Sequence, residues 1–152
     1  MKNIGKKVLT FRSPAVVNGH LSYLNLEQYR GQWVAVSFVP GFSRMEAELL
    51  NRYSMDVELL GTTLLLVSMD PAILGRESAL GTALRFPLVE DSLGRLQRLF
   101  GGSTARTWGR VRTFLLDPEA HFRFHLMHSL SERGMGVFME MLRTYQSDAY
   151  AA

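Results

Sequence analysis

The stretch that decides the fold reads Trp33-Val34-Ala35-Val36-Ser37-Phe38-Val39-Pro40-Gly41-Phe42-Ser43-Arg44-Met45-Glu46. Its first half, Trp33–Val39, is almost entirely β-branched, aromatic or small and apolar, which predicts a strand buried on both faces. Pro40-Gly41 predicts a turn, and a helix is expected to begin at Ser43. This arrangement commonly presents a nucleophile or an anion site, because the N–H groups at a helix N-terminus favour negative charge.

The composition is that of a globular domain. The chain has 152 residues, 47% of them hydrophobic and 20% charged, so we expect a single domain over residues 1–152 with a substantial core. The net charge of +3 is small and spread along the chain, which does not favour nucleic-acid binding. The chain has no cysteine, which excludes disulfides, a thiol nucleophile and a resolving thiol.

The sequence also bears on where the protein works. No segment approaches the roughly 20 apolar residues of a membrane span, so we expect no membrane insertion. The first twelve residues are basic in places but lack the apolar region of a secretory signal. These two observations predict a cytoplasmic protein.

The remaining elements follow from hydrophobic periodicity and turn signals. Two short strands are expected around the turn Asn18-Gly19, and a hairpin around Asp117–Ala120. The expected elements are strands at 15–17, 21–24, 33–39, 63–69, 86–89, 111–116 and 121–127, a short helical turn at 26–31, helices at 43–60, 72–84, 92–100 and 131–146, and a tail from Ser147. This order predicts a thioredoxin-like α/β fold, with a central mixed β-sheet flanked by helices.

Several phrases resemble one known family. Phe86-Pro87-Leu88-Val89-Glu90-Asp91-Ser92-Leu93-Gly94 is similar to the pattern P-L-L-S-D-P-x-G, and the segment from Arg112 to Glu119 is similar to R-x-T-F-x-I-D-P-x-G. Together with the segments 11–19, 26–34, 60–70 and 140–146, they resemble peroxiredoxins of the alkyl hydroperoxide reductase C / thiol-specific antioxidant family. The resemblance implies a thioredoxin-like fold and a thiol-dependent peroxidase ancestry.

The resemblance places Ser43 at the family's peroxidatic cysteine and Glu46 at the glutamate of its C-P-x-E motif. In such enzymes a thiolate at the helix N-terminus attacks the peroxide, with help from a threonine three residues earlier and an arginine on the hairpin strand. Here the cysteine is serine and the threonine position holds Pro40. Arg110 and Arg112 flank the position of the family's arginine, which Val111 occupies.

Ser43 has a second interpretation. Ser43-Arg44-Met45-Glu46 matches the S-x-x-E capping box, in which the two side chains satisfy N–H groups at the start of a helix. A serine hydroxyl supplies no anion near neutral pH without a base, and it cannot form the sulfenic acid of cysteine. We therefore expect a peroxiredoxin-family homologue that is inactive as a thiol peroxidase and acts as a binding or interaction module. The alternative is an antioxidant oxidoreductase, a peroxide reductase seen here as a Cys-to-Ser variant or one that uses a route the sequence does not reveal.

Two partner predictions concern the hairpin. Arg110 and Arg112 share one strand face, and with Ser43 they would hold a small anion or a carboxylate. The segment His121–Met127 is expected to be an edge strand that pairs across a homodimer. In that strand the alternation predicts one polar face, with His121, Arg123, His125 and Met127, and one apolar face, with Phe122, Phe124 and Leu126.

No metal or cofactor is expected. His121 and His125 are four residues apart, about 13 Å along a strand, which is too far for two ligands of one metal ion. Arg44 and Arg106 are expected at the surface. Trp108, in a glycine-flanked loop, is expected either to cover an apolar opening or simply to pack there.

Overall fold

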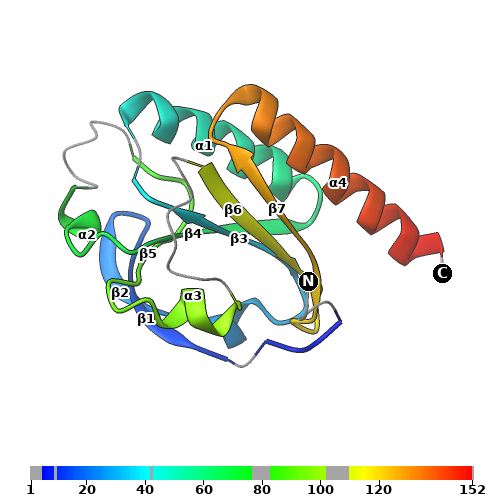
Figure 1. Ribbon diagram of the computed structural model, residues 1–152, viewed down its shortest axis with the longest axis horizontal. Coiled ribbons are helices and arrows are strands. Elements are labelled where there is room, and N and C mark those ends of the chain that lie inside the picture. The colour runs from blue at the N-terminus through cyan, green and yellow to red at the C-terminus, as the bar shows by residue number, and fades with distance from the viewer. Residues whose placement is uncertain (1–4, 9, 42, 77–82, 102–109, 152) are drawn as a thin grey trace.

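The computed structural model describes residues 5–8, 10–41, 43–76, 83–101 and 110–151, with side chains described as far as Ser147. All seven strands lie in one sheet, in the order β2-β1-β5-β4-β3-β6-β7, and Figure 1 shows helices on both of its sides. The strands are β1 Arg12–Val17, β2 His20–Asn25, β3 Trp33–Val39, β4 Thr62–Ser68, β5 Leu88–Glu90, β6 Arg110–Leu116 and β7 Phe122–Ser129. The helices are the short 3-10 helix η1 Leu26–Tyr29, then α1 Arg44–Glu58, α2 Ile73–Arg76, α3 Arg95–Leu99 and α4 Glu132–Ala151.

Strand β3 is central to this sheet. Every one of its seven residues is buried, as its sequence predicts. It pairs in parallel with β4 and antiparallel with β6, so the sheet is mixed, as expected. Because the chain leaves β3 at Val39 and enters α1 at Arg44, the candidate site lies at the carboxyl end of this buried strand, which is paired on both sides.

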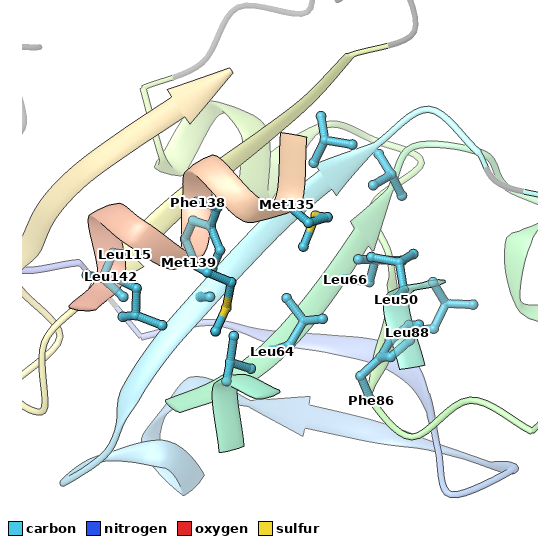
Figure 2. Close-up of a cluster of buried hydrophobic side chains, with 14 of the residues drawn as sticks. Leu50, Leu64, Leu66, Phe86, Leu88, Leu115, Met135, Phe138, Met139 and Leu142 are labelled. Atoms are coloured by element: carbon cyan, nitrogen blue, oxygen red, sulfur yellow. The ribbon is translucent and has the colours of Figure 1, made fainter. Parts of the chain in front are cut away.

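Two hydrophobic clusters cover the two faces of the sheet. Helices α1 and α4 lie side by side over one face (Figure 1), which we call the α1 face. Figure 2 shows Met135, Phe138 and Met139 of α4 pointing toward the strand residues Leu64, Leu66 and Leu115. On the other face, the α3 face, Phe100 packs edge-on against Phe38, Phe114 and Phe122, with ring centroids 5.2–5.3 Å apart.

Strand β7 differs from its predicted alternation. Leu115 pairs with Phe124 and Leu116 with Phe122, so the register shifts at this point and Arg123 is the extra residue of a β-bulge. Phe122 therefore packs on the α3 face against Phe100, whereas Phe124 packs on the α1 face against Phe138 and Tyr145. The prediction that Phe122 and Phe124 share a face is wrong, because a bulge resets the two-residue period.

Two helix ends also differ from the predictions. Helix α4 continues through Ala151 instead of ending at Gln146, since residues 147–151 contain no glycine or proline to stop it. The expected helix at 72–84 is described only as α2, Ile73–Arg76. Residues 77–82 lie outside the described part, and Ala83 and Leu84 have no regular structure. None of the helices in the described ranges is both long and apolar enough to cross a membrane.

The junction of β7 and α4 is too tight for any residue but glycine at position 134. A Cβ added to Gly134 would overlap the Ser129 carbonyl oxygen, and it would lie 2.7 Å from the Ser129 Oγ. Gly136, on the same helix, has open space around its Cα. Gly136 therefore serves as the control for a substitution at Gly134.

We expect Gly134→Ala to lower the free energy of unfolding by about 3 kcal/mol, since backbone must move to relieve the overlap. Gly136→Ala should be neutral or stabilising by up to about 1 kcal/mol, because alanine is the better helix former. Urea denaturation of both variants measures the difference. Equal stabilities would contradict the close packing of α4 on β7.

Candidate functional site

Ser43 is the N-cap residue of α1. Its Oγ accepts a hydrogen bond from the Glu46 backbone N–H at 3.2 Å, and its own N–H donates to Glu46 Oε1 at 2.9 Å. The Ser43 carbonyl accepts the first helical bond, from the Ala47 N–H. The capping box that the sequence predicts is therefore present. Its effect is that the side chains of Ser43 and Glu46 satisfy two N–H groups at the start of the helix.

The other residues around the start of α1 form no reactive group with Ser43. The Arg44 guanidinium forms an exposed ion pair with Glu48, with 3.4 Å between Nε and Oε1. Met45 is 79% exposed. Within the described ranges no basic side chain hydrogen-bonds the Ser43 hydroxyl. The arrangement can cap a helix, but the residues that the structure describes include no base in contact with the serine to activate it.

Arg110 and Arg112 lie on the other side of the sheet. Residue 112 pairs with Phe38 of β3, whose ring packs on the α3 face. Val111 points the opposite way and is buried in the cluster under α1. In the described part of the chain, no hydrogen bond or ion pair joins Ser43 to either arginine. An anion site that contains all three residues stays a prediction that this register does not favour.

A buried polar chain on the α1 face was not anticipated. Ser37 Oγ lies 2.7 Å from Thr113 Oγ1, and Thr113 Oγ1 lies 2.8 Å from His128 Nε2. His128 Nδ1 lies 3.0 Å from the Ser129 carbonyl, which can only accept, so Nδ1 carries the proton. In neutral His128 the Nε2 atom then accepts from Thr113, and Thr113 accepts from Ser37.

This chain is structural rather than catalytic. Ser37, Thr113 and His128 are at most 5% exposed, so no substrate reaches them. Burial lowers the pKa of His128, although the hydrogen bond to the Ser129 carbonyl raises it in part. The ring also stacks on Phe138 of α4, with centroids 6.3 Å apart. Sequence patterns do not reveal the chain because its members come from β3, β6 and β7.

A second polar group holds the β6–β7 turn. Asp117 accepts from the N–H groups of Glu119 and His121 and pairs with Arg123 at 2.6 Å. Burial acts to raise the pKa of Asp117, but the His121 N–H, the Arg123 side chain and the Glu119 N–H together hold it below its usual value. In the described ranges no three His, Cys, Asp or Glu side chains gather as a metal site would require. Arg106 and Trp108 lie outside these ranges.

Known proteins resemble this chain over most of its length. The pattern of the AhpC/TSA family matches residues 4–125. The selenocysteine-containing peroxiredoxin PrxU of Peptoclostridium acidaminophilum is 26% identical over 132 residues, which are 78% of this chain and 64% of that protein. The chain therefore spans less than two thirds of that relative's length.

Solved structures share the fold. The reduced 2-Cys peroxiredoxin of Plasmodium vivax superposes with a TM-score of 0.80 at 18% identity, covering 97% of this chain and 99% of that one. AhpC of Enterococcus faecalis gives a TM-score of 0.79 at 21% identity, covering 99% of this chain and 96% of that one. These likenesses confirm the expected thioredoxin-like fold.

The two histidines of β7 make stability depend on pH. Burial lowers the pKa of both His125 and His128, and Arg112 adds to the effect at His125. Below about pH 6.5, the usual histidine value, the unfolded chain binds protons that the folded chain does not. The free energy of unfolding should therefore keep its highest value above that pH and fall as the pH drops toward 5.

The variant His128→Phe removes one of these groups, so its unfolding free energy should fall less steeply between pH 7 and pH 5. His20→Phe, at an exposed strand position, serves as the control and should keep the slope of the unmodified protein. Chemical denaturation at several pH values measures the slopes. An unchanged slope in His128→Phe would refute the buried neutral histidine.

Proposed function

The chain belongs to the AhpC/TSA family, and from that premise we propose that it is a member without thiol peroxidase activity that acts as a binding or interaction module. The observation that carries the proposal is the capping box at the start of α1. Ser43 stands at the position of the peroxidatic residue, yet its hydroxyl accepts from the Glu46 N–H. Glu46 in turn accepts from the Ser43 N–H, so the reactive position serves the stability of the helix.

Two further features support the loss of peroxide chemistry. The position three residues before Ser43 holds Pro40, which has no hydroxyl to position a peroxide. Val111 occupies the arginine position and is 1% exposed under α1. In the described part of β6, a cysteine in place of Ser43 would therefore find no cationic side chain on this face of the sheet, and thiolate reactivity depends on such partners.

A single-thiol experiment tests this proposal. Because the chain has no cysteine, Ser43→Cys introduces one thiol whose oxidation by hydrogen peroxide can be followed by thiol titration. Ser131→Cys is the matched control, since Ser131 precedes α4 and its Oγ accepts from the Gly134 N–H as a cap does. Both thiols lie at helix N-termini, which lower a thiol pKa to a similar degree.

We expect the two variants to be oxidised at rates within about tenfold of each other, a difference of about 1.4 kcal/mol in activation free energy. Oxidation of Ser43→Cys that is a hundredfold or more faster would show that the peroxidatic geometry survives. That result would support the alternative, an active antioxidant enzyme seen as a Cys-to-Ser variant.

We further propose that the chain forms a homodimer through β7. This strand is at one edge of the sheet, and unpaired edges favour association. The segment Gly5–Val8 already pairs with the start of the strand, through the Gly5 N–H to the Phe122 carbonyl and the Phe122 N–H to the Lys6 carbonyl. The part of β7 available to a second copy is therefore Arg123–Ser129, which lies two residues further along the chain than the expected edge His121–Met127.

Charge on this edge should block the dimer. Met127, on β7, is 40% exposed, and Val137, on α4, is 45% exposed. The two side chains are therefore similarly exposed, but Val137 belongs to α4 rather than to the β7 edge and serves as the control. We expect Met127→Lys to sediment as a monomer and Val137→Lys to remain a dimer at the same concentration, since an edge lysine opposes strand pairing. Analytical ultracentrifugation distinguishes them. A monomeric unmodified protein, or dissociation of both variants, would rule out this interface.

A further inference from the structure

The α3 face of the β6–β7 hairpin gathers positive charge. Arg110 and Arg112 are two residues apart on β6, so they point to the same side, about 7 Å apart. Arg112 pairs with Met127 of β7, which places His125, two residues earlier, diagonally beside it on that side. The group formed by Arg110, Arg112 and His125 lies across the sheet from the cap of α1.

This group has no counter-charge in the described part of the chain. Neither arginine forms an ion pair there. Residues 102–109, which precede Arg110 in the sequence, contain no acidic residue. By contrast, Arg30, Arg44, Arg52 and Arg123 all pair with a carboxylate. The charges of the two hairpin arginines are therefore not balanced by a carboxylate within the described ranges.

Arg112 carries a second, independent signal. Its Nε is buried and has no hydrogen-bond partner among the described residues, although buried polar atoms are normally paired and a buried donor without a partner is costly. Its two cross-strand neighbours, Phe38 and Met127, offer no oxygen or nitrogen acceptor in their side chains. An acceptor from outside the chain would satisfy the unpaired Nε–H donor of Arg112.

His125 is placed to take part. Its ring stacks on Phe114, with centroids 5.3 Å apart and an angle of 19° between the planes, so the ring is held in one orientation. Burial and the nearby Arg112 lower its pKa. A bound anion would offset the repulsion from Arg112 and let the imidazole accept a proton, which would add a charge-assisted hydrogen bond.

We propose that Arg110, Arg112 and His125 form a binding site for a small oxyanion, a phosphate or carboxylate group whose paired oxygens match the donors of a guanidinium. The site lies on the opposite face of the sheet from α1 and Ser43, and it does not require peroxide chemistry to be lost. The proposal names small oxyanions as the ligand class, and their binding can be tested independently of peroxidase activity.

Nuclear magnetic resonance of the full chain tests the site directly. Sodium phosphate and sodium acetate are titrated separately at constant ionic strength, balanced with sodium chloride, while the Arg112 Nε–H and His125 Cε1–H signals are followed. We expect saturable shifts of both signals with a Kd of about 1–10 mM for the better anion, and a rise in the pKa of His125 when it binds. Tighter phosphate binding identifies a phosphoryl ligand, and tighter acetate binding identifies a carboxylate.

Charge-removing variants locate the binding. Arg112→Gln should raise the Kd of the better anion by about tenfold, equivalent to 1.4 kcal/mol. Arg110→Gln should raise it by a smaller factor. Arg143→Gln, at an exposed position of α4 that forms no ion pair with the described residues, is the control and should bind as the unmodified protein does. Because Arg110 is exposed, its variant should fold even if Arg112→Gln does not. Absence of saturable shifts, or equal weakening in Arg143→Gln, would overturn the proposal.

Discussion

The burial of β3 on both faces is the constraint on which the rest of the structure depends. Its neighbours on each side, β4 and β6, are fixed to it by continuous ladders, and both hydrophobic clusters include its side chains. Such a strand cannot slip by one residue without exchanging its two apolar faces. The position of α1, and therefore of Ser43, follows from where this strand ends.

The same alternation decides what the site contains. In β6 the residue under α1 is Val111, and the arginines on either side of it face α3. Side chains one position apart along a strand lie on opposite faces, so a shift of one residue is enough to place the hairpin's charge on the α3 face without any change of fold. The family scaffold is thus retained while its polar groups serve other purposes: Ser43 and Glu46 cap α1, and Arg110 and Arg112 lie beside His125.

The sequence predicted the parts that local rules control. The bounds of β3 and the capping box at Ser43 agree with the structure, because a continuous apolar run and an S-x-x-E motif depend on adjacent residues. The bulge at Arg123 and the buried chain of Ser37, Thr113 and His128 were not predicted. Both depend on how separate strands pair with one another, and the alternation within one strand does not determine the register of its pairing with another. The joint anion site of Ser43, Arg110 and Arg112 stays a prediction. The register places both arginines on the α3 face, and the spacing of the sequence put them on one face without saying which.

The central claim is that a peroxiredoxin scaffold persists here without its peroxide chemistry. The most direct measurement is the rate at which the unmodified chain consumes hydrogen peroxide in the presence of a thiol reductant, compared with the reductant alone. The account predicts identical rates at every protein concentration, because a capped serine supplies neither a thiolate nor an activated hydroxyl. A rate that rises in proportion to protein and saturates with peroxide would contradict it.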